Sequence, residues 1–539
     1  MSILTDLKMY ARFALGLRRF LRHTISLDEA KKIVKQQMID REKNFMHLIK
    51  RGIFGYPKSP YLPLLKLAGC GMGDIENMIR DKGLESTLLA LREAGVYVTF
   101  EEFKGREPIV RKGKAIPVRL HDFDNPYLSH HYYGESSGTT GVGTRIEIDL
   151  DHHLAQTPSV MLCYDAHGVL HVPAAFWYGI LPDITGVNNI LRSALFGNVP
   201  KKWFSYIRKR DFKPSLKYLI ATQYLIVMGR FFGVLIPSPE SVPLDQAGMV
   251  ARWAFETIKS YGACLVRTHT SMAVRVCAAA KEEGLDLTGT TFMGGGEPPT
   301  PAKVREIMRV GACWVPTYFF AETGSVGWGC AQPADGNDLH LFKHLSALIQ
   351  YPRQVPGSEI TIDAFHFTSL LPTAPKIMLN VESDDYGVIE TRSCGCPLEG
   401  YGFTEHIRHV RSFRKLTGEG VTLVGNEMIK ILEEVLPMRF GGSPLDYQLL
   451  EEEDEGGFTR LNLLVSPKIK IPNEEEIIEA VLNALGRSSV SADLAQSIWR
   501  EAKTLRVKRM DPIWTARGKL MPLHLSQSSE DFSKKGEKQ

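Results

Sequence analysis

One unit near the middle of the sequence constrains the fold most. "GTTFM" (289–293) has the composition of a short buried strand, and the glycine-rich "GGGEPP" follows it as a loop. Thr300 is a helix N-cap with Pro301 at the first helical position, which predicts a helix that leads to the next strand, "CWVPTYFF" (313–320). In such a unit the loop after the first strand lies at the carboxyl edge of a parallel sheet, where ligands bind. Similar strand and helix segments alternate from about 115 to 325, so we predict an α/β fold.

Length and composition limit the class of protein. The chain has 539 residues, which is too long for one core and predicts roughly two to four domains. A hydrophobic content of 44% and a charged content of 23% are ordinary for a globular protein. The net charge of +4 is small for this length and argues against nucleic-acid binding. The 8 cysteines are too few for a disulfide scaffold, so we expect a cytoplasmic protein.

Two apolar segments raise the question of a membrane. Residues 1–110 have a mostly helical pattern, and 1–24 lacks the apolar region and cleavage site of a signal peptide. Apolar residues recur there at helical spacing among arginines and lysines, so this helix either docks on the body or touches an anionic membrane surface. The stretch 218–237 contains Arg230, which would cost about 2.5–3.5 kcal/mol at the centre of a bilayer. We therefore expect 218–237 to form a buried helix of a large domain.

The order of the predicted strands and helices changes past about residue 410. "YQLLEEEDEGGFTRLNLLV" (447–465) predicts a hairpin with an acidic turn, and "NEEEIIEAVLNALG" predicts a helix capped by Asn473. Another helix and the strand "LRVKRM" follow. These elements predict a small α+β domain, and the polar tail that ends the chain is expected to be disordered.

A loop of glycine and hydroxyl residues, "YYGESSGTTGVGTRIEIDL" (132–150), lies near the start of the α/β region. No Gly-Lys-Ser/Thr sequence opens a helix there, so the segment is not a P-loop. "TRIEIDL" alternates like a strand, which predicts a strand–loop–strand turn. This turn either is structural or binds a polyphosphate through backbone N–H groups, hydroxyls and Arg145.

"SSGTTGVGTR" resembles the phosphate-binding loop of the adenylate-forming superfamily, and most of all its phenylacetate–CoA ligase branch. Four further segments resemble family motifs in the family's order: the adenine-side loop in "GGGEPP" (294–299), the Tyr-Gly-x-Thr-Glu motif in "YFFAETG" (318–324), the hinge in "VRSFRKLTGEG" (410–420) and the C-terminal Gly-Lys motif in "TARGKLMPL" (515–523). Together the motifs span about 136–523, and their order makes the resemblance specific.

The resemblance implies a large N-terminal α/β domain with mixed sheets flanked by helices, joined by a hinge to the small C-terminal α+β domain. The expected divisions are 1–110 for a helical region of the large domain, 111–410 for the nucleotide- and acid-binding core, 411–525 for a small mobile domain and 526–539 for the disordered tail.

The family's chemistry gives expected roles to single residues. A carboxylate attacks the α-phosphorus of ATP to form acyl-AMP and pyrophosphate, and a thiol, usually that of coenzyme A, then takes the acyl group. By resemblance, Glu322 binds Mg²⁺, Lys519 bridges the carboxylate and the α-phosphate, and Arg411 reaches ribose or phosphate. Tyr318 would stack on adenine. Asp385 is the candidate for the ribose hydroxyls, with the adjacent Asp384 as the alternative.

The nucleotide-binding set implied by the resemblance is therefore drawn from three motifs, the phosphate-binding loop, the adenine-side loop and the Glu motif, and from the candidate Asp385. Its members are Ser136, Ser137, Gly138, Thr139, Thr140, Gly141, Arg145, Gly295, Gly296, Glu297, Tyr318 and Asp385.

The chain also departs from the family's motifs. Gly143 stands where the family often has proline, and Phe319 and Ala321 replace the glycine and threonine of the Glu motif. Phe413 and Arg414 replace the two acidic residues expected after the hinge arginine. The hinge residue, and the domain rotation that follows adenylation, are therefore left open.

Four metal-ligating side chains lie near the Glu motif and downstream of it. Cys394 and Cys396 form a tight pair, and Cys330 and His340 frame "CAQPADGNDLH". Three thiolates and one imidazole would make a closed tetrahedral Zn²⁺ site, and some members of the phenylacetate–CoA ligase-like group carry a comparable set. The alternative is four free, mostly buried residues.

The sequence thus predicts an ATP-dependent acid–thiol ligase that uses ATP, Mg²⁺ and coenzyme A. Two alternatives stay open: a ligase that loads a carrier protein or another acceptor, and a non-catalytic nucleotide-binding regulatory homologue. Phe231, Phe232, Phe319 and Phe320 favour an aryl or medium-to-long acyl acid if they line the pocket rather than the core. The family leads us to expect a homodimer.

Overall fold

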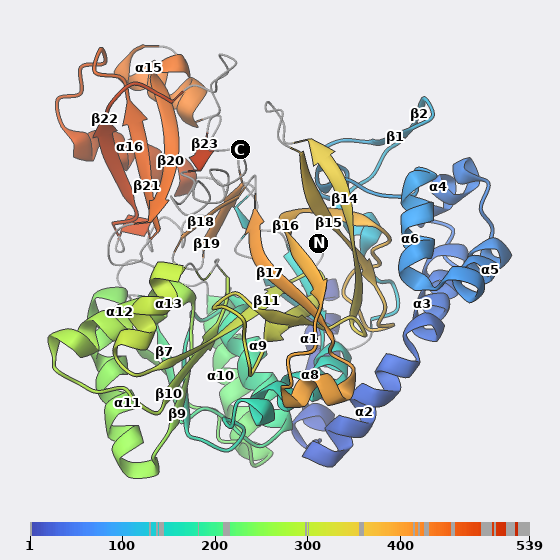
Figure 1. Ribbon diagram of the computed structural model, residues 1–539, viewed down its shortest axis with the longest axis horizontal. Coiled ribbons are helices and arrows are strands. Elements are labelled where there is room, and N and C mark those ends of the chain that lie inside the picture. The colour runs from blue at the N-terminus through green and yellow to red at the C-terminus, as the bar shows by residue number, and fades with distance from the viewer. Residues whose placement is uncertain are drawn as a thin grey trace, which may run out of the picture.

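The chain is described by a computed structural model in which a large body carries a smaller group of strands and helices at its upper edge (Figure 1). The residues described are 3–128, 131–135, 138–139, 145–181, 183–207, 216–296, 299, 301–354, 361–412, 415–418, 421–424, 431–442, 444–453, 459–486, 499–500, 503–513 and 523–525.

A single long sheet organises the large body. Within the described residues it has 12 strands, in the spatial order β14 (Ser346–Gln354), β15 (Thr361–Ser369), β16 (Val381–Thr391), β17 (Glu405–Ser412), β13 (Leu339–Leu341), β12 (Gly324–Gly329), β11 (Cys313–Phe320), β10 (Thr290–Gly294), β9 (Cys264–Arg267), β6 (Ala174–Trp177), β7 (Lys202–Ser205) and β8 (Pro239–Ser241). The strands from β14 to β11 pair antiparallel, and those from β11 to β8 pair parallel. This confirms the predicted α/β class with mixed sheet structure.

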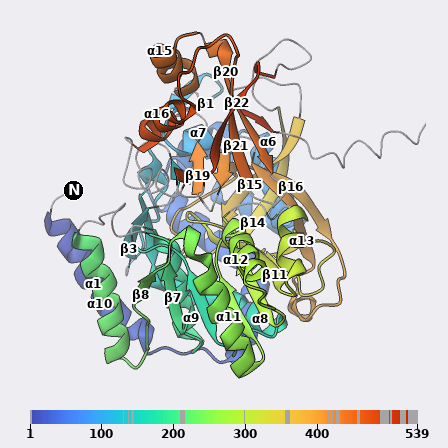
Figure 2. The same ribbon diagram turned by 90° about the vertical axis from the view of Figure 1, so that its left-hand side faces the viewer.

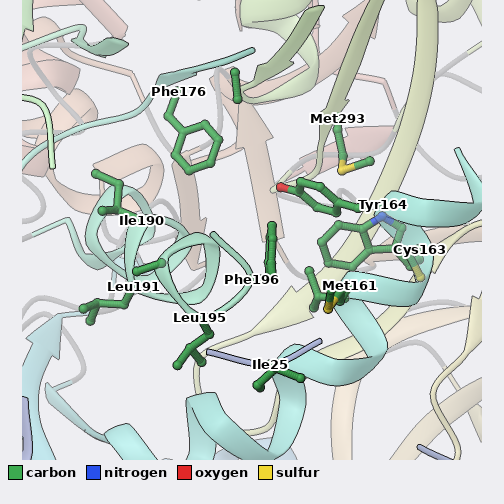
Figure 3. Packing of buried hydrophobic residues seen from close by; sticks show 14 of the residues in the cluster. Ile25, Met161, Cys163, Tyr164, Phe176, Ile190, Leu191, Leu195, Phe196 and Met293 are labelled. Atoms are coloured by element: carbon green, nitrogen blue, oxygen red, sulfur yellow. The ribbon is translucent and has the colours of Figure 1, made fainter. Parts of the chain in front are cut away.

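The strand–loop–helix–strand unit predicted around residue 300 is confirmed. β10 and β11 pair parallel with Phe292 opposite Trp314, and α13 (Pro301–Arg309) connects them. Helices cover both faces of the parallel half, which is why its strands read as continuous apolar runs. Along β9, Val266 packs on the side of α11 (Ala247–Tyr261) and α12 (Thr270–Glu282), whereas Leu265 packs on the side of α8 (Leu150–Ala166) and α9 (Ile184–Leu195). Figure 3 shows part of the second of these cores.

The N-terminal 110 residues are mostly helical, as predicted. The helices are α1 (Ile3–Leu21), α2 (Leu27–Ile39), α3 (Arg41–Ile49), α4 (Tyr61–Ala68), α5 (Met72–Lys82), α6 (Leu84–Glu93) and α7 (Phe100–Phe103), and the short strands β1 (Ile109–Arg111) and β2 (Lys114–Ile116) follow. Ser26 caps α2 through its side chain, which accepts a hydrogen bond from the Glu29 N–H. Helices α3 to α7 pack with the antiparallel strands of the sheet around a third core.

Helix α10 (Leu216–Phe231) corrects one expectation from the sequence. We expected a buried helix, but only one face of α10 packs on the body, through residues such as Leu225 and Ile226. The side chains of Val227 and Phe231 are 59% and 76% exposed. Apolar composition indicated burial, but a single surface helix has only one face to bury. In the part of the chain that is described, no helix is long and apolar enough to cross a membrane.

The chain's C-terminal part forms the smaller group of elements. Its members are α15 (Leu436–Phe440), β20 (Tyr447–Glu453), β21 (Thr459–Val465), α16 (Glu474–Gly486), β22 (Leu505–Arg509) and β23 (Leu523–Leu525). The predicted hairpin is β20–β21, and the predicted helix is α16, which buries Ile477, Val481 and Leu485. The four strands form a separate sheet in the order β22-β21-β20-β23.

Candidate active site

Glu322, the predicted Mg²⁺ ligand, lies in the turn between β11 and β12 and is buried. Lys104, which directly follows α7, donates a hydrogen bond of 2.7 Å from Nζ to Glu322 Oε1. Burial alone would raise the pKa of Glu322, but the charge and the hydrogen bond of Lys104 outweigh it and lower that pKa to about 2. The carboxylate is therefore ionised at neutral pH and already has a cation beside it.

Two predicted nucleotide-binding residues meet in the structure. Tyr318 on β11 donates a hydrogen bond of 2.7 Å from its hydroxyl to Asp385 Oδ2 on β16. Burial and the Asp385 charge raise the pKa of Tyr318, so the phenol stays neutral and can act as a donor. Asp384, the alternative, is fully buried. Arg411 lies on the adjacent strand β17, opposite Tyr386 in the register.

Glycines bring the loop after β10 against the start of this site. A Cβ at Gly294 would lie 1.6 Å from the carbonyl oxygen of Thr268, and one at Gly295 would lie 2.0 Å from that of Thr317. Gly296 has a φ of 87°, in the region that favours glycine. The loop thus approaches the residue before Tyr318 as closely as the backbone permits. Glu297 lies outside the described residues.

The predicted phosphate loop is the connection of a hairpin. β3 (His131–Glu135) and β5 (Arg145–Asp149) pair antiparallel, which confirms the strand–loop–strand arrangement. Gly138 and Thr139 form β4, which pairs parallel with β19 (Val421–Val424) in a sheet with β18 (Lys415–Gly418). The loop thus touches the segment that follows the predicted hinge.

Several predicted residues cannot be placed. Ser136, Ser137, Thr140, Gly141 and Lys519 lie outside the described residues, as do Phe413, Arg414 and Gly420 of the hinge segment. Only the backbone of Arg145 is described, opposite Glu135 at the base of the hairpin.

A buried polar cluster beside the site was missed from the sequence. His152 Nε2 and Gln156 Nε2 lie 3.1 Å and 2.8 Å from the carbonyl oxygen of Thr323, next to Glu322. Gln156 Oε1 accepts a hydrogen bond of 3.2 Å from Arg192 on α9. No clear signal was present in the sequence, because Arg192 lies on the polar side of α9 with Asn189 and Ser193, a side that would be expected to face water but is buried here. For Lys104, no local pattern in the sequence marks its role.

The four phenylalanines that would line either an acid pocket or the core lie in different surroundings. Phe231 points into solvent, and Phe232 lies under Arg22 at 5.2 Å. Phe319 and Phe320 lie on β11, and the Phe320 ring packs 4.8 Å from that of Phe367 in the core. Phe231 therefore does not belong to the core, which was one of the two alternatives.

A second candidate site is formed by the predicted metal ligands. One donor atom from each of Cys330, His340, Cys394 and Cys396 can be chosen so that all lie within 4.8 Å of one another. His340 Nε2 is 3.1 Å from Cys396 Sγ and 3.8 Å from Cys394 Sγ. Ligands around a tetrahedral zinc ion are separated by about 3.5–3.8 Å, given bonds of about 2.0–2.3 Å. The residues fit a zinc ion in number, type and spacing.

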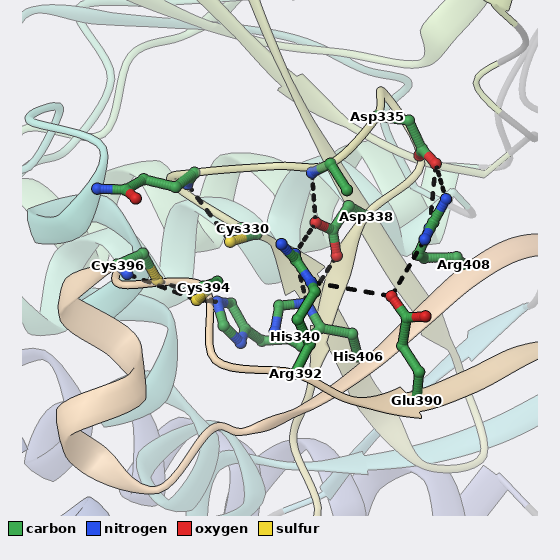
Figure 4. Close-up of polar contacts among 12 residues, drawn as sticks. Cys330, Asp335, Asp338, His340, Glu390, Arg392, Cys394, Cys396, His406 and Arg408 are labelled. Carbon is green, nitrogen blue, oxygen red and sulfur yellow. Dashed lines mark hydrogen bonds and ion pairs between the residues drawn. The ribbon is translucent and has the colours of Figure 1, made fainter.

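Neighbouring charges orient this cluster (Figure 4). The hydrogen bond from the Cys330 thiol, followed by His340, lowers the pKa of Cys396 to about 3, so a thiolate is already favoured. Behind His340, the His406 ring lies 4.2 Å away and its Nδ1 is 2.6 Å from Asp338 Oδ1. Asp338 therefore orients the His406 ring, which packs against the ring of the proposed ligand His340.

No family model matches the chain, and no curated protein matches its sequence. Among solved structures, a 2-hydroxyisobutyryl-CoA ligase, crystallised with 2-HIB-AMP and CoA in the thioesterification state, aligns with 94% of this chain and 91% of its own, at a TM-score of 0.51 and 15% identity. This chain has the fold of that ligase. The amide bond synthetase McbA from Marinactinospora thermotolerans aligns with 94% of this chain and 97% of its own, at a TM-score of 0.40 and 11% identity.

Proposed function

We propose that the chain is an ATP-dependent, adenylate-forming ligase. A carboxylate oxygen of the acid attacks the α-phosphorus of ATP, the bond to the β-phosphate oxygen breaks, and pyrophosphate leaves. The thiol of coenzyme A then attacks the acyl carbon, AMP leaves, and the thiol proton is released. The observation that carries this proposal is the meeting of Glu322, Lys104, Tyr318 and Asp385 around the end of β11, in a fold shared with an acyl-CoA ligase.

The residues at β11 suit the binding of a nucleotide. Tyr318 offers an aromatic face for adenine. Asp385 offers carboxylate oxygens that can accept hydrogen bonds from ribose hydroxyls, either in addition to its hydrogen bond from Tyr318 or in place of it. In the glycine loop at the carboxyl edge of β10, Gly294 and Gly295 are buried, and Gly296 is exposed where a ligand of such a sheet would bind. The motif resemblance adds the hairpin loop for the phosphates and Lys519 for the charge that develops at the α-phosphate.

Mg²⁺ fits this site only together with ATP. The Glu322 carboxylate is ionised, and hard carboxylate oxygens suit Mg²⁺, but the Lys104 ammonium beside it repels a lone cation. Polyphosphate can pair with Lys104 and leave Glu322 to the metal. Mg²⁺, when bound, supplies charge neutralisation for the phosphates.

A pyrophosphate-exchange assay with a panel of acids tests the proposal. We expect exchange of labelled pyrophosphate into ATP that depends on one class of acid and falls at least about a hundredfold in Lys519→Ala. Lys468→Ala, which removes an exposed lysine of the same C-terminal part, is the matched control and should keep full exchange. If no acid supports exchange, or if both variants behave alike, the proposal is wrong. Replacing coenzyme A by a holo-carrier protein then identifies the acceptor.

We also propose that Cys330, His340, Cys394 and Cys396 bind one structural Zn²⁺. The close spacing of the four donors and the depressed pKa of Cys396 support it. Metal analysis of the purified protein should give about one zinc per chain, whereas a value below about 0.2 with freely titratable thiols would exclude the site.

A further inference from the structure

Two arginines are buried inside the large body, and neither has an acidic partner among the residues that the structure describes. Arg267 and Arg192 are 3% and 8% exposed, and within the described residues no carboxylate lies within ion-pair distance of either. Arg267 donates to Asn189 Oδ1 at 2.8 Å and to the Tyr164 hydroxyl at 3.3 Å. The Nε of Arg267 is buried and has no hydrogen-bond partner in the described part of the chain. A buried cation that has only neutral partners is unusual, because charges removed from water are normally paired.

The second arginine adds to this positive charge. Arg192 donates to His153 Nδ1 at 3.3 Å and to Gln156 Oε1 at 3.2 Å. His153 is neutral, because burial and then Arg192 lower its pKa well below the usual value. Burial and then the charge of Arg267 lower the pKa of Arg192 to about 10, so the two guanidinium groups are close enough to repel each other. A single anion between or beside them would satisfy both.

The pair lies where a substrate of the proposed reaction would sit. Arg267 is the last residue of β9, at the carboxyl edge of the parallel sheet, and β10 beside it leads into the glycine loop. His269, two residues on, has Nδ1 at 3.1 Å from the Gly295 carbonyl oxygen. Arg192 donates a hydrogen bond to Gln156, and Gln156 donates one to the carbonyl oxygen of Thr323, the residue after Glu322. The two arginines therefore border both the nucleotide loop and the proposed metal ligand.

Aromatic side chains surround Arg267. Its guanidinium carbon lies 5.1 Å from the ring centre of Trp328 and 5.9 Å from that of Phe176. Figure 3 shows Phe176 from β6, Tyr164 from α8 and Met293 from β10 in the same core. An acid with a carbon skeleton could pack on these surfaces while its charged end meets the arginines.

We propose that Arg267, supported by Arg192, binds a second anionic group of the acid substrate, so that the substrate class is dicarboxylic acids. This inference rests on the proposed function. A guanidinium binds a carboxylate through two parallel hydrogen bonds, and a site built for such a group rejects an analogue that lacks it, because its own charges are then left unpaired. The carboxylate that is not activated binds Arg267, and the other one reaches the α-phosphorus.

The test compares each diacid with its monoamide of equal length: glutarate with glutaramate, and adipate with adipamate. Wild-type protein should use a diacid in pyrophosphate exchange at least about thirtyfold better than the monoamide, in kcat/KM. Arg267→Met should abolish that preference by raising KM for the diacid, with KM for ATP unchanged, and Arg267→Lys should restore part of it. Arg252→Gln removes an exposed arginine that pairs with Glu283, and this control should keep the preference.

Binding alone provides a second readout. Diacid should raise the midpoint of thermal unfolding of wild-type protein, and monoamide should not. Arg192→Gln should weaken this effect.

Failure of the dicarboxylate inference can be told apart from failure of the ligase proposal. If neutral acids support Lys519-dependent exchange and diacids neither react nor stabilise the protein, the dicarboxylate inference is overturned and the ligase proposal stands. If no acid reacts, the ligase proposal fails. If Arg267→Met does not fold, and wild-type protein treats diacids and monoamides alike, the arginines have a structural role and the dicarboxylate inference is overturned.

An independent observation concerns the surface formed by α1 and α10, which we name the α1/α10 face. Figure 2 shows both helices at the same edge of the molecule, and Arg22 beyond α1 lies 5.2 Å from the Phe232 ring beyond α10. Its exposed apolar side chains are Leu15, Leu219, Ile220, Val227, Phe231 and Leu235. Its exposed arginines are Arg12, Arg18, Arg19, Arg22 and Arg230. A surface that exposes both apolar side chains and arginines is complementary to an anionic membrane, because the arginines can pair with lipid phosphates and the apolar groups can contact acyl chains.

We infer that the α1/α10 face docks on anionic membranes. Flotation with vesicles of phosphatidylcholine and phosphatidylserine should recover the full-length protein, whereas pure phosphatidylcholine vesicles should not. Arg18→Glu with Arg19→Glu should lower partitioning by about fivefold or more per charge, and Phe231→Glu should also weaken it. Met438→Glu changes an 86% exposed apolar residue in the C-terminal part and should have no effect. Equal recovery with both vesicle types, or equal behaviour of Phe231→Glu and Met438→Glu, would overturn the inference.

Discussion

Replacing Lys104 by methionine should destabilise the protein far more than replacing an ordinary surface lysine. The side chains of Lys104 and Glu322 are 14% and 10% exposed, so little water screens the pair. The methionine keeps most of the side-chain volume but leaves the Glu322 carboxylate buried without its cation. Breaking a buried pair in this way costs about 3–5 kcal/mol, and we expect a loss of about 3 kcal/mol in the free energy of unfolding, because Lys376 also contributes favourable charge.

Urea unfolding at pH 7 in EDTA, followed by tryptophan fluorescence, measures this loss. The control is Lys202→Met, whose ion pair with Glu240 has a similar length of 3.0 Å but side chains that are 46% and 40% exposed. It should cost less than about 1 kcal/mol. Adding Glu322→Gln to Lys104→Met should recover much of the loss, because the neutral amide needs no cation. Equal losses for Lys104→Met and Lys202→Met, or no recovery in the double variant, would refute the reasoning.

Three further predictions concern other parts of the molecule. Cys396→Ser should lower the zinc content to well below one per chain and make the thermal midpoint insensitive to a chelator that destabilises the wild type. Gly294→Ala should destabilise by more than about 3 kcal/mol, because its Cβ would lie 1.6 Å from a carbonyl oxygen, whereas Gly400→Ala meets open space and should cost less than about 1 kcal/mol. Burial lowers the pKa of His344 to about 3, so the unfolded state binds more protons than the folded state between about pH 6.5 and 3. Stability should therefore fall as the pH falls, by about 2 kcal/mol from this group at pH 5, and His344→Gln should remove that part in urea titrations at pH 7 and pH 5.

Local patterns in the sequence predicted the elements that local physics determines. The β10–α13–β11 unit follows from a helix start at Pro301 between two apolar runs, although the predicted cap Thr300 lies outside the described residues. The hairpin of β3 and β5 follows from the alternation of "TRIEIDL" after a glycine loop. The helix from Asn473 follows from its cap and apolar spacing: the Asn473 side chain accepts a hydrogen bond of 2.9 Å from the Glu475 N–H. These features depend on residues that are close in the sequence.

Contacts between distant residues could not be predicted in the same way. Lys104 and Glu322 are 218 positions apart, and only the packing of the N-terminal helices on the sheet brings them together. The Cys394-x-Cys396 pair was visible, but its approach to His340 depends on the pairing of β13 with β17. Arg267 ends the apolar strand β9, and its burial depends on contacts with Tyr164 of α8 and Asn189 of α9, which are far away in the sequence. The exposed face of α10 was misjudged because hydrophobic content does not reveal how many faces a helix buries.

The most direct test of the central claim follows oxygen atoms through the reaction. An acid labelled with ¹⁸O in its carboxylate, such as ¹⁸O-labelled adipate, is incubated with the protein, ATP, Mg²⁺ and coenzyme A, and the nucleotide product is analysed by mass spectrometry. If the carboxylate attacks the α-phosphorus, one ¹⁸O stays on the phosphorus when the thiol takes the acyl group, so the product is AMP that carries one ¹⁸O. Unlabelled AMP, or ADP with the label in inorganic phosphate, would contradict adenylate formation by this chain.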